Sequence, residues 1–335
     1  MSMPTKISTN PAAGGLSQSA TRSWPSVLSA LFKARLTSLV LMTTAVGFHF
    51  GAQDGIGGVT FWHTLIGTGV LAAGAAALNQ FWERDADALM QRTAGRPIPS
   101  GQIDPLVALS LGAALSIAGM LQLTFFVNPL TGLLGMVTLA SYVFIYTPLK
   151  KITSLNTIVG AVPGALPPLM GWTAATGELG AGGWALFTLL FFWQMPHFMA
   201  IAWMYREDYA RGGFRMLPVV DPSGARTGST AIRHTVALLA FSLSPVALGL
   251  AGRWYAGAAL LLGVAFLFFA IRFALRLHRE SARSLFLASI VYLPLVLGFL
   301  VADKVTIRPR LAGGLVEVGV LSAIHSVESS IPNQP

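Results

Sequence analysis

Acidic and amide side chains recur at a helical spacing between Asn79 and Asp87. On a helix, Asn79, Glu83 and Asp87 occupy positions i, i+4 and i+8, so their side chains lie along one face. Hard oxygen donors in this arrangement suit Mg²⁺, which keeps several waters and binds through one or two carboxylates together with substrate phosphates. An ordinary solvated helix end with i, i+4 pairing would give the same pattern, and the spacing alone leaves both interpretations open.

Basic residues in two later segments could hold an anion beside such a metal. Arg92 and Arg96 are four residues apart, next to Pro97, and guanidinium groups match phosphate oxygens in bidentate pairs. Tyr146 and Lys150 are also four apart and can offer a hydroxyl and an ammonium group to one anion. Anchoring of a membrane segment on its cytoplasmic side would explain Lys150 equally well.

A second acidic cluster contains Glu207 and Asp208. Adjacent residues diverge by about 100° on a helix, so only one of these carboxylates can face the first cluster. Arg211 then opens a basic loop broken by two glycines, which suits a mobile cover over phosphate groups. A simple turn that obeys the positive-inside rule is the alternative for this loop.

His197 follows Pro196 about one turn inside an apolar segment. An imidazole at this depth needs a partner. It is either a neutral histidine hydrogen-bonded to a neighbour or a group that contacts a ligand or substrate.

Composition predicts the elements that must position these residues. The chain has 335 residues, of which 54% are hydrophobic and 10% charged, and its apolar runs are long enough to cross a hydrocarbon core of roughly 30 Å. Backbone groups in lipid must be paired within a helix, so we expect an all-α polytopic membrane protein. The predicted transmembrane helices are nine, near residues 33–51, 61–80, 105–124, 127–146, 154–173, 181–203, 234–252, 254–274 and 284–303.

The basic residues predict the orientation of these helices. With the amino terminus inside, 18 of the 22 Lys and Arg residues fall in inside segments, which obeys the positive-inside rule and predicts N-in, C-out. The net charge of +9 therefore follows the loops and forms no basic patch for nucleic acid. The absence of cysteine excludes disulfides and thiolate catalysis.

The sequence predicts that the chain consists of three regions. Residues 1–30 lack a long apolar run and are expected to form a disordered cytoplasmic arm. Residues 31–303 form the nine-helix domain. The tail, residues 304–335, is too weakly apolar to span a membrane, and its role is not predicted.

The order of these motifs resembles the intramembrane prenyltransferases of the UbiA superfamily. The resemblance covers residues 30–303 and rests on Asn79-x3-Glu83-x3-Asp87, Arg92-Thr93-x2-Arg96-Pro97, Tyr146-x3-Lys150 and the second acidic segment. Within the superfamily, Trp193-Gln-Met-Pro-His197-Phe, Arg206-Glu-Asp208-Tyr and Met216-Leu-Pro are similar to the haem-farnesylating members. The second motif of the superfamily is commonly Asp-x3-Asp, whereas Tyr205 and Tyr209 stand here and leave Asp208 as the nearest carboxylate.

This resemblance implies nine helices around a membrane-facing central cavity, in the bacterial inner membrane, with the active site on the cytoplasmic side. The implied substrates are farnesyl diphosphate and haem B, with the farnesyl group passing to a haem vinyl group to give haem O and diphosphate. It further implies Mg²⁺ on Asn79, Glu83, Asp87 and Asp208, diphosphate on Arg92, Arg96, Lys150 and Arg211, and His197 at the acceptor. The implied catalytic residues are the four metal ligands together with Lys150 and Tyr146. A haem A synthase or an oxidase assembly protein is the implied partner.

Two alternatives remain open. The first is a prenyltransferase of the same superfamily with another acceptor, such as a hydroxybenzoate, a quinone precursor or a chlorophyllide. The second is a transporter for an anionic lipid or phosphate, because charges within a membrane also mark translocation paths. The position of the charged clusters at inner helix ends favours catalysis.

Overall fold

The computed structural model describes residues 23–52 and 57–305, and every regular element of more than one residue in that part of the chain is a helix. The elements, in order, are α1 (Trp24–Leu31), α2 (Ala34–Gly51), α3 (Val59–Leu89), α4 (Pro105–Phe126), α5 (Pro129–Ala140), the π-helical η1 (Ser141–Tyr146), α6 (Thr147–Ile152), α7 (Asn156–Thr176), α8 (Ala181–Met204), α9 (Arg206–Arg211), α10 (Leu217–Val220), α11 (Ala225–Phe241), α12 (Ser244–Ala247), α13 (Arg253–Arg276) and α14 (Arg279–Ala302).

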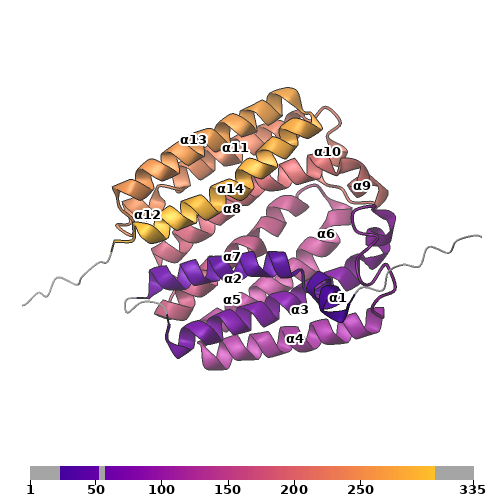
Figure 1. Ribbon diagram of the computed structural model, residues 1–335, viewed down its shortest axis with the longest axis horizontal. Helices are drawn as coiled ribbons and strands as arrows, with labels where there is room; N and C mark the ends of the chain where they lie inside the picture. Colours follow the sequence, from indigo (N-terminus) through magenta and orange to yellow (C-terminus); the bar gives the residue numbers. More distant parts are fainter. Residues whose placement is uncertain (1–22, 53–56, 306–335) are drawn as a thin grey trace, which may run out of the picture.

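Eight helical segments of the described residues are long and apolar enough to cross a membrane. The number becomes nine if α1 and α2, which meet at a bend of 55°, count as one broken span. The predicted all-α fold is confirmed, and the spans follow the predicted order. The first and last described residues lie at opposite ends of the bundle (Figure 1), as an odd number of spans requires.

Two helices differ from a predicted boundary by nine residues. Helix α3 continues nine residues beyond position 80, and Glu83 and Asp87 in this extension are buried in the protein. Helix α11 begins at Ala225 instead of residue 234, so Arg226 and Arg233 lie on its exposed face and not in a loop. Its start is fixed by Asp221, whose carboxylate accepts hydrogen bonds from the backbone and hydroxyl of Thr227.

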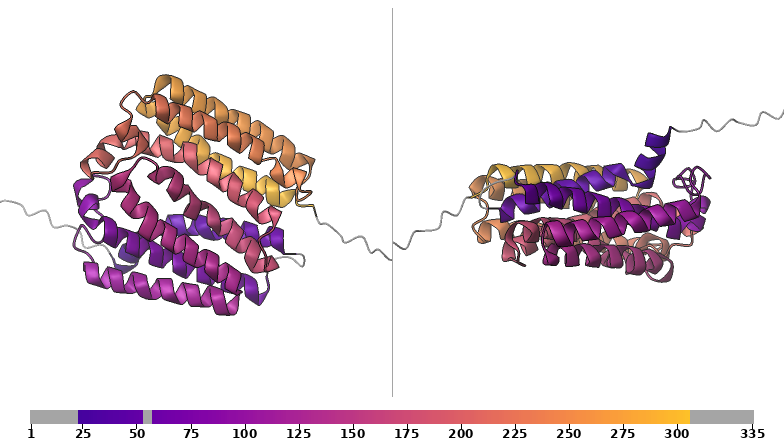
Figure 2. Two further views of the ribbon diagram at one scale, coloured as in Figure 1. Left: turned by 180° about the vertical axis from the view of Figure 1, so that it is seen from behind. Right: turned by 90° about the horizontal axis from the view of Figure 1, so that it is seen from below.

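The helices lie side by side in two groups (Figure 1). The first contains α2, α3, α4, α5 and α7, and the second contains α8, α11, α13 and α14. Contacts between α7 and α8 join the groups. Seen from below, the long helices run roughly parallel and α1 projects at one end (Figure 2).

Glycines let α2 and α7 approach closely. A Cβ atom at Gly47 would overlap the carbonyl of Pro168, and one at Gly171 would overlap the carbonyl of Thr44. Small residues commonly bring helices together in membranes, where lipid is as apolar as leucine and van der Waals packing must supply the attraction. The position of α2 beside the centre of the bundle therefore depends on these two glycines.

The largest apolar cluster lies among α8, α11, α13 and α14 and includes the fully buried rings of Tyr255, Phe266 and Phe273. Large apolar side chains are also exposed on the outer faces, for example Phe125, Leu261 and Leu275. On a helix of this length an apolar outer face is suited to lipid. The protein is an integral membrane protein with several spans.

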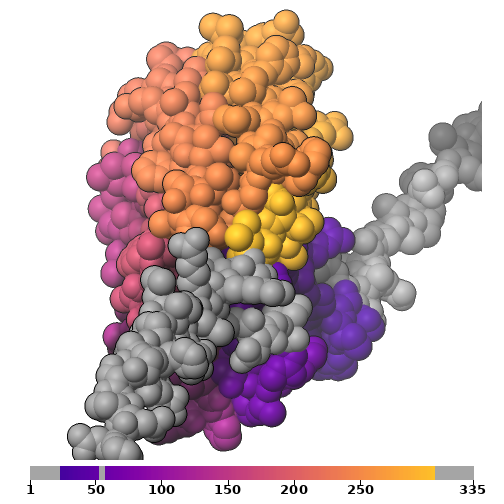
Figure 3. Space-filling model, turned by 90° about the vertical axis from the view of Figure 1, so that its left-hand side faces the viewer, coloured from indigo at the N-terminus to yellow at the C-terminus, as the bar shows by residue number. Residues whose placement is uncertain are grey.

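The predicted arm and tail fall largely outside the described residues, which omit 1–22 and 306–335. Of the arm, residues 24–30 belong to α1, which contacts α2 and α3. Of the tail, Lys304 pairs with Ala251 in an isolated antiparallel bridge. Its ammonium group donates to the backbone oxygens of His49, at 2.5 Å, and Ala52, at 3.1 Å. The end of α14 thus packs against the end of α2. Figure 3 views the bundle from this end.

Candidate active site

Helix α3 places the first motif on one buried face. Asn79, Glu83 and Asp87 are each at most 5% exposed, whereas Trp82 and Asp85 between them are exposed. The three side chains follow one another along a continuous helix, as the spacing predicts. Burial of two carboxylates requires partners, because an unpaired buried charge is strongly destabilising.

Two cations pair with these carboxylates. Lys150 Nζ, from α6, lies 2.5 Å from Glu83 Oε1. Arg96, from the turns after α3, places Nη1 at 2.6 Å from Asp87 Oδ2 and 3.9 Å from Glu83 Oε2. The ring of Tyr146 lies below Lys150, with 4.5 Å between Nζ and the ring centroid. The predicted residues Lys150 and Arg96 therefore contact the first motif directly, and Tyr146 contacts Lys150.

Lys33 completes the cationic group from the bend between α1 and α2. Its Nζ donates to Asn79 Oδ1 at 2.5 Å and to Tyr142 Oη at 3.3 Å. Lys33 adopts the left-handed region, at φ 48°, which is uncommon for a residue other than glycine. Gln80 holds this bend in place by donating to the carbonyls of Ala30 and Leu31 at the end of α1.

Arg92 is held by the two tyrosines that replace the usual aspartates. Its guanidinium carbon lies 4.7 Å from the ring centroid of Tyr205 and 5.1 Å from that of Tyr209. Arg92 Nη2 also donates to Tyr209 Oη at 3.0 Å. Guanidinium groups stack favourably on aromatic faces. In this chain the second motif therefore positions a cation.

Asp208 lies behind this group. It is buried, and its Oδ1 accepts hydrogen bonds from the backbone N–H of Gln91, at 3.1 Å, and from the Arg211 guanidinium. Glu207 is exposed, so the two adjacent carboxylates do diverge. Asp208 and Arg211 tie α9 to the turn that carries Arg92, and neither lines the cavity described next.

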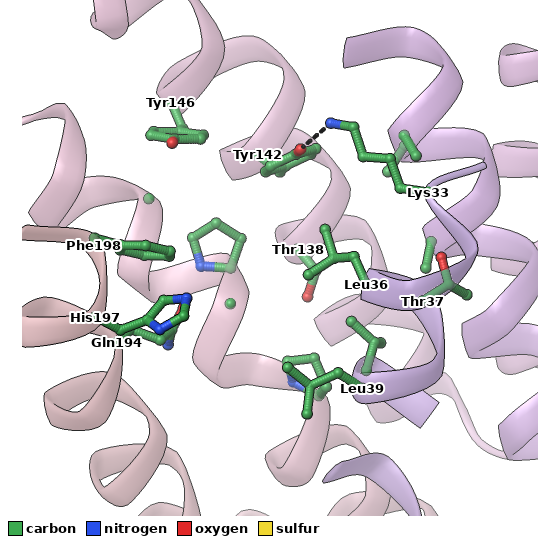
Figure 4. A pocket seen from close by; sticks show the side chains of 18 of the residues that line it. Lys33, Leu36, Thr37, Leu39, Thr138, Tyr142, Tyr146, Gln194, His197 and Phe198 are labelled. Atoms are coloured by element: carbon green, nitrogen blue, oxygen red, sulfur yellow. Dashed lines mark hydrogen bonds between the residues drawn. The ribbon is translucent and has the colours of Figure 1, made fainter. Parts of the chain in front are cut away.

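A cavity of about 350 Å³ opens at these groups and extends among the helices. Its polar end is lined by the cations Lys33, Arg92, Arg96 and Lys150 and by the carboxylates Glu83 and Asp87. Its body is lined mainly by apolar residues of α2, α3, α7 and α8. Figure 4 shows Lys33, Tyr142 and Tyr146 at one end and His197 with Gln194 facing Leu39 further along. The cavity therefore has a cationic head and an apolar body.

His197 lies on the α8 side of this body. Its ring stacks on Trp193, with 5.0 Å between ring centroids, and its Nδ1 lies 2.7 Å from Ser289 Oγ of α14. His197 is partly exposed and lines the cavity. The neighbour that a buried imidazole needs is present, and the ring still reaches the space where a ligand would lie.

The fit of a metal can be tested on the oxygen atoms. Over residues 23–52 and 57–305, no three His, Cys, Asp or Glu side chains gather into a cluster that could hold one, because Asp208 turns away from Glu83 and Asp87. Asp87 Oδ1 is nevertheless buried without a hydrogen-bond partner. A free carboxylate oxygen beside Glu83, at the cationic end of a cavity, fits the small protein contribution that Mg²⁺ takes when phosphate oxygens supply other ligands.

Residues 40–314 match the family model described as the UbiA prenyltransferase family. The chain belongs to this family. The UbiA prenyltransferase is 48% identical over 283 residues to a protein of Solibacter usitatus named Protoheme IX farnesyltransferase, covering 82% of this chain and 97% of that one. It is 42% identical over 280 residues to the human protein named Protoheme IX farnesyltransferase, mitochondrial, covering 84% of this chain and 62% of the human one.

Solved structures of distant relatives share the fold. A structure of a digeranylgeranylglyceryl phosphate synthase superposes on this UbiA prenyltransferase with a TM-score of 0.71 at 16% identity, over 83% of this chain and 98% of that one. A UbiA homologue from Archaeoglobus fulgidus, bound to GPP and Mg²⁺, superposes with a TM-score of 0.58 at 15% identity, over 82% and 99% of the two chains.

Lys33 and Tyr142 of this prenyltransferase lie in the site although the sequence did not predict them there. Lys33 stands directly before an apolar segment, where it is indistinguishable from a membrane anchor. Tyr142 lies within the apolar run that forms α5 and η1. Its spacing of four from Tyr146 is the one available signal, and the two rings do stack, with 5.8 Å between centroids.

Proposed function

We propose that this UbiA prenyltransferase transfers the farnesyl group of farnesyl diphosphate to a vinyl group of haem B, giving haem O and diphosphate. The donor is supported by one observation, the cavity whose cationic head continues into an apolar body. The acceptor is supported by the names of relatives that are 42–48% identical over more than four fifths of this chain.

The charges at the polar end favour a diphosphate. Four basic side chains and two carboxylates line it, so basic groups outnumber acidic groups by two. Arg92 and Arg96 can each bind phosphate oxygens in pairs, whereas Lys33 and Lys150 act as point charges. The isoprenoid chain would then lie along the apolar walls between α2, α3 and α7, where its burial is favourable.

Glu83 and Asp87 are the residues that would hold Mg²⁺, with Asp87 Oδ1 as the free oxygen. The metal would neutralise charge that develops on the diphosphate as it leaves. Asn79 and Asp208 contribute differently in this proposal. Asn79 holds Lys33, and Asp208 holds the turn that carries Arg92.

The reaction begins when the C1–O bond of the donor breaks and diphosphate departs with the bonding electrons. Lys33, Arg92, Arg96 and Lys150 stabilise the charge on the leaving oxygens. The remaining allylic cation accepts the π electrons of a haem vinyl group, which forms the new C–C bond. Water adds to the resulting cation and loses a proton, which gives the hydroxyethylfarnesyl side chain.

Water must stay away until the new bond has formed. The rings of Tyr142 and Tyr146 and the apolar side chains of the cavity body exclude it from the allylic carbon. Such a site works within a membrane, where both the isoprenoid and the macrocycle can enter from lipid. We further propose the bacterial inner membrane with the polar end facing the cytoplasm, and a haem A synthase or oxidase assembly protein as partner.

The decisive experiment incubates the purified protein in detergent with haem B, farnesyl diphosphate and Mg²⁺ and searches for farnesylated haem by mass spectrometry. Product should form, and should vanish on chelation of Mg²⁺ and in Asp87→Asn. Asp85→Asn is the matched control, because Asp85 lies on the same helix with an exposed side chain. If a hydroxybenzoate, a quinone precursor or a chlorophyllide is prenylated and haem is not, haem B is the wrong acceptor. If intact farnesyl diphosphate crosses the membrane of vesicles without turnover, the protein is a transporter.

A further inference from the structure

A chain of hydrogen bonds fixes which nitrogen of His197 carries the proton. Ser289 Oγ donates its one hydrogen to the backbone carbonyl of Phe286, at 2.5 Å. With that hydrogen on the Phe286 carbonyl, the same oxygen is the acceptor in its 2.7 Å contact with His197 Nδ1. Nδ1 is therefore the protonated nitrogen of a neutral ring, and Nε2 keeps its lone pair.

Neighbouring aromatic rings fix the orientation of the His197 ring. His197 packs between Trp193, at 5.0 Å between centroids, and Phe286, at 5.1 Å. Trp193 Nε1 in turn donates to the carbonyl of Ser289 at 2.9 Å, which joins α8 to α14 beside the histidine. Among the residues that the structure describes, none hydrogen-bonds to Nε2, and the ring projects from α8 into the cavity (Figure 4).

Helix α7 contributes small residues to the cavity wall. Gly160, Pro163, Gly164 and Pro167 all line it, and their spacing of i, i+3, i+4 and i+7 places them on one helix face. Tyr146 and Gln194 pack onto this stripe: a Cβ atom at Gly160 would overlap the Tyr146 ring, and one at Gly164 would overlap the Gln194 amide. The two glycines therefore let Tyr146 and Gln194 pack against α7 at the cavity wall, beside His197 of α8.

We propose, resting on the proposed function, that His197 Nε2 is the axial ligand of the haem iron and that Ser289 is the positioning residue that presents it. Metal-bound histidines usually donate their other N–H to a fixed acceptor, which sets both tautomer and ring direction. The Ser289 hydroxyl supplies that acceptor. The lone pair of Nε2 passes to the iron and no proton is released, because the ring is already neutral.

The test uses the full chain in detergent with ferric and ferrous haem B, and separately with iron-free protoporphyrin IX. Resonance Raman spectra of the ferrous haem should contain an iron–histidine stretching band in the unaltered protein. His197→Gly should abolish this band, and added imidazole should restore it. Binding of iron-free protoporphyrin IX, followed by fluorescence, should change less than twofold in His197→Gly, because that ligand offers no iron.

Matched variants separate ligation from general damage. His234→Ala is the control for His197, since His234 on α11 bonds a backbone carbonyl through Nδ1 and lies outside this cavity. Ser289→Ala should raise the haem dissociation constant about 10- to 100-fold, the usual effect of removing the partner of a metal-bound histidine. Ser284→Ala, which removes a hydroxyl bonded to the Glu280 carbonyl on the same helix, should leave the constant unchanged.

The outcomes are distinguishable. An iron–histidine band that survives in His197→Gly overturns this inference, while formation of farnesylated haem by that protein would leave the proposed function standing. Equal haem affinities of Ser289→Ala and Ser284→Ala overturn the role of Ser289. Failure of the unaltered protein to bind either porphyrin or to form farnesylated haem overturns the proposed function and this inference together.

Discussion

Lys150 Nζ lies 2.5 Å from Glu83 Oε1, across 67 residues of sequence, and this contact joins α6 to the acidic face of α3. Both side chains are at most 12% exposed. The pair is therefore a structural link as well as a part of the polar end of the cavity.

Lys150→Met should lower the free energy of unfolding by about 3–5 kcal/mol, because it leaves the Glu83 carboxylate buried beside one remoter cation. Adding Glu83→Gln should recover most of that stability but no prenyl transfer, since both charges are then absent. Thermal unfolding in detergent and turnover measure the two effects. Lys151→Met alters an exposed neighbour and should change neither; equal loss in both lysine variants would show that only net charge matters.

Lys33→Gly should raise the KM for farnesyl diphosphate at least tenfold, because a charge-assisted contact worth about 1.5–3 kcal/mol is lost. Relief of the left-handed backbone, at about 1–3 kcal/mol, should offset much of the lost hydrogen bond to Asn79 in the unfolding free energy. Leu277→Gly is a matched control, because Leu277 has the same φ within 1° and lies far along the chain at the end of α13. It should not alter KM, and a similar rise in both variants would assign the effect to the backbone.

Arg92→Lys should weaken donor binding about tenfold although charge is kept, since an ammonium group cannot stack on Tyr205 and Tyr209 while binding phosphate in pairs. Tyr209→Phe removes only the hydroxyl contact and should have a smaller effect than Tyr209→Leu, which removes the ring face. Equilibrium binding of a non-hydrolysable farnesyl diphosphate analogue gives the comparison. Equal affinities of Tyr209→Phe and Tyr209→Leu for the analogue would exclude a role for stacking on the Tyr209 ring.

Asp208→Asn should loosen the turn that carries Arg92 and raise the KM for the donor, with little change in the Mg²⁺ concentration needed for half-maximal rate. The reason is that Asp208 bonds Gln91 and Arg211 and does not line the cavity. Glu207→Gln alters the exposed neighbour and should change neither the KM for the donor nor the Mg²⁺ requirement. A several-fold higher Mg²⁺ requirement in Asp208→Asn alone would return Asp208 to the metal site, as the family resemblance implies.

The predicted N-in, C-out orientation can be tested on this cysteine-free chain without removing any native thiol. Single cysteines at the exposed positions Glu178 and Glu207 lie at opposite ends of α8. An impermeant maleimide added to intact cells should label Glu178→Cys, and Glu207→Cys should react only after lysis. Labelling in the reverse order would invert the orientation.

The sequence predicted those parts of the site that follow from local periodicity. Asn79, Glu83 and Asp87 lie on one helix face because a single helix of fixed pitch carries all three. The apolar runs likewise predicted the helices, because lipid demands their length and internal hydrogen bonding. Hydropathy failed where polar side chains stay inside the protein, as at the end of α3, and where an amphipathic helix starts with exposed arginines, as in α11.

Contacts between distant residues could not be predicted in this way. The stacking of Arg92 between Tyr205 and Tyr209 joins positions more than 100 residues apart, and the spacing of tyrosines alone carries no sign of an arginine. The same holds for Ser289 beside His197. Lys33 enters the site only because the chain bends between α1 and α2, and that bend depends on Gln80 of a later helix.

The contact of Lys304 with the end of α2 affects the order in which the protein assembles during its synthesis. The carbonyl of His49 is made 255 residues before the ammonium group that binds it. During synthesis, α2 enters the membrane early, and its last carbonyls must be hydrated until α14 has followed. The contact between the first and last spans therefore forms late in assembly. A chain released from the ribosome before residue 304 would lack the Lys304 hydrogen bonds that join these two spans.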